Sequence, residues 1–209
     1  MKFNTTTMAL LISGSFAFAG LAAAQAPQPL TTNTAVATAP GKAVVAQTTK
    51  VSATVVSLDA GTRTVSLKAA NGKVFDVIAG PEVRNFDQIK VGDVVAAEYV
   101  QALSLELKKR TAGTKAPGAA TVDQGAARTA QGEKPGVAGG RQVTAIADVV
   151  AVDTKTHLVT LRGPKGNQVD LNVQDPAQLK NIKKGDQVEV VYTEAVAVVV
   201  VAAPKAAAK

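Results

Sequence analysis

The sequence predicts an all-β protein built from two tandem, small, five-stranded OB-like (Greek-key) barrels that are joined by a flexible linker. Three observations lead to this prediction: apolar and polar residues alternate over short segments, Asp and Gly separate the segments, and the whole pattern occurs twice. Strict alternation over four to eight residues is typical of a half-buried strand. Closing each short sheet into a barrel would remove its exposed edges.

The internal repeat relates residues 53–102 to residues 147–195. ATVVSLD in the first segment matches ADVVAVD in the second, and IKVGDVV matches IKKGDQV closer to the end. The polar residues between these blocks also correspond in order. We therefore interpret the two segments as copies of one β unit.

The chain begins with Lys2, an apolar run from Met8 to Leu21, and the small residues Ala22 to Ala24. This order is typical of a signal peptide that is cleaved after Ala24. The apolar run is shorter than the roughly 20 residues that span a bilayer. We therefore expect no transmembrane span after cleavage and a periplasmic or secreted protein. The predicted organisation is signal peptide 1–24, disordered linker 25–47, β-barrel repeat 48–110, flexible linker 111–140, second β-barrel repeat 141–203 and tail 204–209.

Each repeat is expected to contain five strands in the same order. An Asp turn follows the first strand, a Gly-containing hairpin follows the second, and a connection that begins with Pro precedes the fourth. Val95, Ala97 and Tyr99 share one face of the fourth strand, as do Val188, Val190 and Tyr192 in the second copy. The fifth strands are predicted at 103–109 and 196–202.

The fifth strand of the second repeat is apolar on both faces, so it needs cover on both sides. We therefore regard its edge as a candidate interaction surface, and the basic cluster beside the central linker as a second candidate that could touch anionic envelope surfaces. Ordinary solvation of a strand end is the alternative for the cluster. Whether the repeats pack on each other or pair between chains as a homodimer is left open. The candidate surface residues are Val196, Val198, Val200, Lys108, Lys109 and Arg110.

Composition excludes several kinds of site. The chain has no Cys, no Trp and a single His, His157, so thiolate sites, multi-histidine metal sites and histidine relays are excluded. The net charge of +7 is spread along the chain, and few aromatic residues remain for base stacking, so no nucleic-acid partner is expected. The recurring carboxylates are expected to be turn residues or to point outward from strands, and whether Asp59, Asp153, Asp93 or Asp186 bind anything is left open. No catalytic, cofactor-binding or metal-binding residue is predicted.

The pattern of VSLD, TVSL, a Gly-Lys pair and IKVGDVV resembles small exported OB-like proteins of bacteria. Its layout is similar to that of the periplasmic copper/silver chaperone of the Cus efflux system. That family binds metal through Met, His and Trp on its second and third strands. The chain after residue 24 has neither Met nor Trp, and His157 stands alone, so the resemblance implies a fold and not the metal function.

These observations lead to one expected function and one alternative. We expect an exported, non-enzymatic binding or interaction module of the bacterial envelope that needs no cofactor and whose partner is an envelope protein or polymer. The alternative is a periplasmic metal or small-ligand chaperone with an OB-like barrel.

Overall fold

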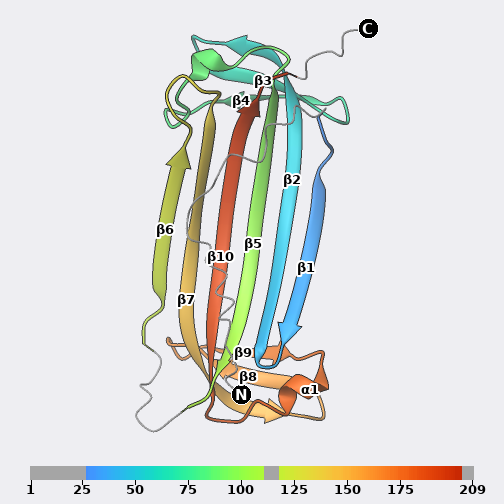
Figure 1. Ribbon diagram of the computed structural model, residues 1–209, viewed down its shortest axis with the longest axis vertical. Coiled ribbons are helices and arrows are strands. Elements are labelled where there is room, and N and C mark those ends of the chain that lie inside the picture. Colours follow the sequence, from blue (N-terminus) through green and yellow to red (C-terminus); the bar gives the residue numbers. More distant parts are fainter. Residues whose placement is uncertain (1–26, 111–117, 204–209) are drawn as a thin grey trace, which may run out of the picture.

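The computed structural model describes residues 27–110 and 118–203. Within these residues the protein is all-β, as expected, and its ten strands form one antiparallel sheet (Figure 1). Six long strands lie side by side in the order β1-β2-β5-β10-β7-β6, and two pairs of short strands continue the sheet at opposite ends. The strands are β1 (Thr31–Ala39), β2 (Lys42–Asp59), β3 (Thr64–Ala69), β4 (Val74–Ile78), β5 (Val94–Lys108), β6 (Thr121–Arg128), β7 (Gly136–Asp153), β8 (Leu158–Arg162), β9 (Gln168–Asn172) and β10 (Gln187–Val201).

The sheet is not closed, so the prediction of two separate five-stranded barrels is not met. β5 and β10 pair with each other over their whole length, from Val94 opposite Val201 to Lys108 opposite Gln187. Because the hydrogen bonds of both strands are used in this pairing and in the pairs with β2 and β7, neither strand can close a barrel of its own. The two halves of the chain therefore share one open sheet.

The expected fourth and fifth strands are one continuous strand in each half. β5 runs through residues 99–103 without interruption, and β10 runs through the matching residues 192–196. Neither segment contains Gly or Pro, which are the residues that most often end or bend a strand. At 15 residues each, these strands are longer than a small barrel needs, and they extend from one end of the molecule to the other.

Segments expected to be linkers also contain strands. β1 and the start of β2 lie within residues 25–47, while β6 and the start of β7 lie within residues 111–140. The Thr and Val residues of β1 suit a strand, and Pro40-Gly41 forms the two-residue turn into β2. The predicted signal peptide 1–24, residues 111–117 of the central linker and the tail 204–209 lie outside the described residues.

The two ends of the molecule are built alike. The register shifts by a bulge after Val55 on β2 and after Val149 on β7, and each bulge is followed by an Asp turn. Asp59 accepts hydrogen bonds from the backbone N–H groups of Gly61 and Thr62, and Asp153 accepts the corresponding pair. These bonds, with that to Thr62 contributing most, hold the pKa of Asp59 below its ordinary value. The predicted role of both carboxylates as turn residues agrees with this geometry.

The connections that begin with Pro each contain one short helical turn. Residues 81–89 contain the 3₁₀ turn η2 (Phe86–Gln88), and α1 (Pro176–Leu179) lies in the second connection. The side chain of Asp175 accepts a hydrogen bond from the backbone N–H of Ala177 and so caps α1. Among the described residues, no helix is long and apolar enough to cross a bilayer.

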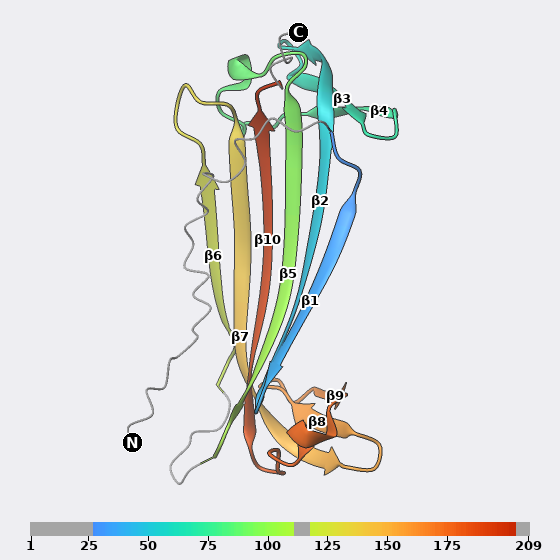
Figure 2. The ribbon, with the colours of Figure 1, turned by 45° about the vertical axis from the view of Figure 1, so that its right-hand side comes forward.

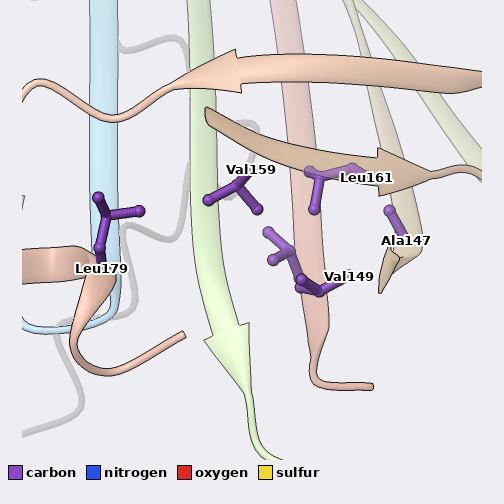
Figure 3. Packing of buried hydrophobic residues seen from close by; sticks show 6 residues of the cluster. Ala147, Val149, Val159, Leu161 and Leu179 are labelled. Carbon is purple, nitrogen blue, oxygen red and sulfur yellow. The ribbon is translucent and has the colours of Figure 1, made fainter. Parts of the chain in front are cut away.

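The hydrophobic cores lie at the two ends and not in the middle. At one end Val55, Val65 and Leu67 are buried with Ile89, and Val95 and Val200 pack against them. At the other end the cluster of Val149, Val159 and Leu161 is drawn in Figure 3, where these side chains point toward one another. Each cluster covers one end of the long strands.

Both clusters cover the same face of the long strands. Val95 and Leu105 are an even number of residues apart on β5, as are Val190 and Val200 on β10, so all four point to one face. Figure 2 shows both groups of short strands projecting from the same side of the sheet. We call this the capped face and the other the open face.

Candidate binding surface on the capped face

The part of the capped face between the two clusters is not covered by any described element. We call it the central band. Ten residues separate Val190 in one cluster from Val200 in the other, a distance of roughly 33 Å at the usual rise of a strand. Six strands at the usual spacing give a width of roughly 24 Å. The band therefore offers roughly 800 Å², which is the area that one partner contributes to a standard protein interface.

An apolar row crosses the central band at right angles to the strands. Residues directly opposite one another in neighbouring strands point to the same face, so the register identifies the members of each row. Three valines of this row, Val36, Val45 and Val122, are 66%, 42% and 54% exposed. The row consists of Val36, Val45, Leu103, Tyr192, Val143 and Val122.

A polar row runs beside the apolar row. Its members come from the same six strands and lie two residues further along each of them. Every one can donate or accept a hydrogen bond. The row consists of Thr34, Gln47, Gln101, Glu194, Arg141 and Gln124. The band therefore presents an apolar stripe bordered by hydrogen-bonding side chains, which is the composition of a protein interface.

Two tyrosines contact the polar row from its two sides at the centre of the sheet. The hydroxyl group of Tyr99 donates a hydrogen bond to Glu194, and Arg141 Nε donates to the other carboxylate oxygen at 3.0 Å. On the other side of the centre, Gln101 Nε2 donates to the hydroxyl oxygen of Tyr192 at 3.0 Å. These bonds connect both rings to the polar row.

The tyrosine contact changes the acidity of both its partners. The hydrogen bond to Glu194 raises the pKa of Tyr99 to about 12, because ionising the phenol would place two negative charges side by side. The same bond from Tyr99, followed by that from Arg141, lowers the pKa of Glu194. Near neutral pH the centre of the band is therefore a neutral phenol beside an ionised carboxylate and a guanidinium group.

The open face differs in character because its central residues are small. Ala46, Ala102 and Ala195 lie there, and a shallow hollow of about 380 Å³ is lined by Gly125 and Gly140 among others. A side chain at Gly140 would meet the carbonyl oxygen of Glu194 at 2.9 Å, so β7 and β10 approach too closely for any larger residue. The charged side chains of this face pair with one another, as Lys50 does with Glu98.

The structure separates the two groups of predicted surface residues. Val196 and Val198 lie on the central band, Val196 being 46% exposed, whereas Val200 packs in an end cluster. The expectation that their strand is an edge is wrong, because β10 is hydrogen-bonded to β5 and to β7. A strand that is apolar on both faces suits this central position.

The basic cluster lies at the C-terminal end of β5, and each of its three residues forms an ion pair. Lys108 contacts Glu106 and Glu189, Lys109 contacts Asp186, and Arg110 contacts Asp148. These neighbours reduce the positive charge that an anionic surface would meet. The geometry therefore favours the alternative in which this cluster belongs to the strand end.

The carboxylates of Asp93 and Asp186 are occupied by hydrogen bonds and ion pairs within the chain. Each carboxylate accepts a hydrogen bond from a backbone N–H three residues earlier and pairs with a lysine, Lys134 for Asp93 and Lys109 for Asp186. Among residues 27–110 and 118–203 there is no group of three or more His, Cys, Asp or Glu that could hold a metal ion. His157 is half-buried in the turn immediately before β8 and has a left-handed backbone (φ 58°).

Sequence reasoning missed the central network. Alternation placed Tyr99 and Tyr192 on core-facing sides of barrels, whereas the sheet leaves them half-buried on an uncovered band. Arg141 and Glu194 are far apart in the sequence, and only the pairing of β7 with β10 brings them together. The Pro40-Gly41 turn was a signal that could have identified β1.

Comparisons with protein-family models, with curated proteins and with solved structures give no significant match to this chain.

Proposed function

We propose that the protein is an exported, non-enzymatic interaction module of the bacterial envelope, in which two copies of one β unit form a single sheet that binds a partner protein through the central band. The observation that carries this proposal is the uncovered apolar row and its polar neighbour between the two end clusters. An exposed apolar row of this kind is typical of an interaction site. Tyrosine and arginine at its centre are the residues most often found at binding hot spots.

A protein partner is favoured over a polymer by the character of the surface. The band is broad, and its apolar row crosses six strands, so it suits a second folded surface with a matching stripe. The apolar side chains would exclude water from the hydrogen bonds of Tyr99, Glu194 and Arg141. The removal of water would strengthen these bonds and make the centre selective for a complementary partner.

Site-specific photo-crosslinking in the producing bacterium tests the proposal. A photoreactive residue replaces Val45 on the central band, and the matched control replaces the adjacent Val44, which points to the open face. We expect a discrete adduct with one envelope protein from position 45 and none from position 44. Adding Tyr192→Ala to the position-45 variant should reduce the adduct, while circular dichroism should show an unchanged fold.

Three results would contradict the proposal. Equal adducts from positions 44 and 45 would show that the band is not selective. An adduct formed only with a second copy of the chain would indicate that the band mediates self-association and does not bind a separate partner. A thermal-shift scan against Cu(I), Cu(II), Zn²⁺ and Ca²⁺ that found stabilisation by one ion alone would favour the chaperone function, since a ligand at 100 times its Kd stabilises by about 2.7 kcal/mol.

A further inference from the structure

The two edges of the sheet differ in how well they are protected against pairing with another chain. β1 pairs with β2 and β6 pairs with β7, and within the described residues neither strand has a neighbour on its other side. An unpaired edge presents backbone N–H and C=O groups that can bind another strand. Natural proteins usually block such edges with charged residues, Pro or bulges.

β6 carries such protection and β1 does not. β6 contains Asp123, Gly125 and Arg128, and Arg128 forms an ion pair with Glu82. The nine residues of β1 read TTNTAVATA, with no charge, no Pro and no Gly, and all nine are exposed. Its pairing with β2 is regular from Thr31 to Ala39 without a bulge. Among the residues that the structure describes, β1 is therefore a regular, uncharged edge strand with no strand paired to its outer side.

β1 is also complementary to itself. Two copies placed antiparallel about Ala35 would bring Thr32 opposite Thr38 and Thr34 opposite Val36, which are favourable cross-strand pairs. Within the chain, Thr32 and Thr49 already show such a pair, with their hydroxyl oxygens 3.3 Å apart. Every second residue of β1 would contribute both an N–H and a C=O to the new ladder.

We propose that a second copy of this chain binds at the β1 edge, so that two molecules form one continuous sheet about a two-fold axis through Ala35. The axis is perpendicular to the sheet, so the capped faces of both copies lie on the same side. Pairing β1 with β1 uses up the unprotected edge and leaves the charged β6 edges outermost, which closes the assembly as a dimer. This proposal does not depend on the proposed function.

Charged substitutions at Ala35 test both the choice of β1 as the pairing edge and the position of the two-fold axis. Light scattering after size-exclusion chromatography should give twice the chain mass for the unaltered protein. Ala35→Lys and Ala35→Glu each place two like charges directly opposite one another, so each should weaken dimerisation about tenfold or more. An equimolar mixture of the two variants should restore the dimer, because opposite charges then face each other.

The matched control is Val122→Lys, which adds the same charge to an exposed position of the other edge strand, β6. This variant should remain dimeric. Because the residues of β1 and Val122 on β6 are exposed, each variant should keep the circular dichroism spectrum of the parent. A monomeric parent protein, equal weakening by Val122→Lys, or a mixture that stays monomeric would overturn the proposal. Assemblies that grow with concentration would also overturn it, since they would indicate pairing of β1 with β6 in an open chain.

Discussion

Replacing the buried carboxylate of Asp93 by an amide should be more costly than the same change at Asp186. The Asp93 side chain is 4% exposed, and its two oxygens accept hydrogen bonds from the backbone N–H groups of Lys90 and Ala203 and from Lys134. An amide has one acceptor oxygen, so Asp93→Asn leaves at least one donor facing an NH₂ group, whichever way it is turned. The variant also leaves the Lys134 ammonium group without its counter-charge.

The magnitudes follow from burial. Lys134 is 29% exposed, so its ammonium group is only partly hydrated when the carboxylate is removed. A buried hydrogen bond to a charged group contributes about 1.5–3 kcal/mol, and breaking a buried ion pair by removing one partner costs about 3–5 kcal/mol. Because this pair is partly exposed, we expect Asp93→Asn to lower the free energy of unfolding by about 2–4 kcal/mol.

Asp186 provides the comparison within the same chain. It is 11% exposed, its partner Lys109 is 55% exposed, and it accepts from the backbone N–H of Lys183. Water can hydrate Lys109 after the change, so Asp186→Asn should cost about 1–2 kcal/mol. Glu82→Gln removes an ion pair between exposed side chains and should cost no more than about 0.5 kcal/mol.

Urea unfolding at pH 7, followed by far-UV circular dichroism, measures the three free energies. A double-mutant cycle with Lys134→Met should show that the two changes at the Asp93 pair cost less together than their sum. The reasoning fails if Asp93→Asn costs no more than Asp186→Asn, or if neither differs from Glu82→Gln.

Three other predictions concern packing and titration. Val55→Ala should lower the free energy of unfolding by about 2–3 kcal/mol because Val55 is fully buried, whereas Val56→Ala, at a position 37% exposed, should cost less than half as much by urea unfolding. Gly140→Ala should destabilise by about 1–3 kcal/mol through contact with the neighbouring strand, while Gly125→Ala, where nothing lies within 4 Å, should leave Tm nearly unchanged in calorimetry. The raised pKa of Tyr99, about 12, means that absorbance at high pH should show a phenol ionising near pH 12 that is missing in Tyr99→Phe. Because the folded pKa lies above the unfolded value near 10, the stabilisation from this group is complete below pH 10 and is lost as the pH rises through about 12.

The sequence by itself determined the local structure. Alternation in segments such as 64–68 and 158–162 predicted strands with one apolar face, because successive side chains of a strand point to opposite sides. Asp59 and Asp153 predicted their turns, since the carboxylate can accept hydrogen bonds from nearby backbone N–H groups. Pro81 and Pro176 predicted short connections. Each of these features depends on residues that are close together in the chain.

Only the tertiary structure decided which strands pair. Backbone N–H and C=O groups are the same at every residue, so a pattern that predicts a strand does not name its neighbour. The choice of β10 as the partner of β5 depends on the fit of two 15-residue strands along their whole length, far apart in the sequence. That one choice opens the sheet, leaves β1 and β6 as edges, and brings Tyr99 to Glu194, because register between distant strands is set by their combined packing.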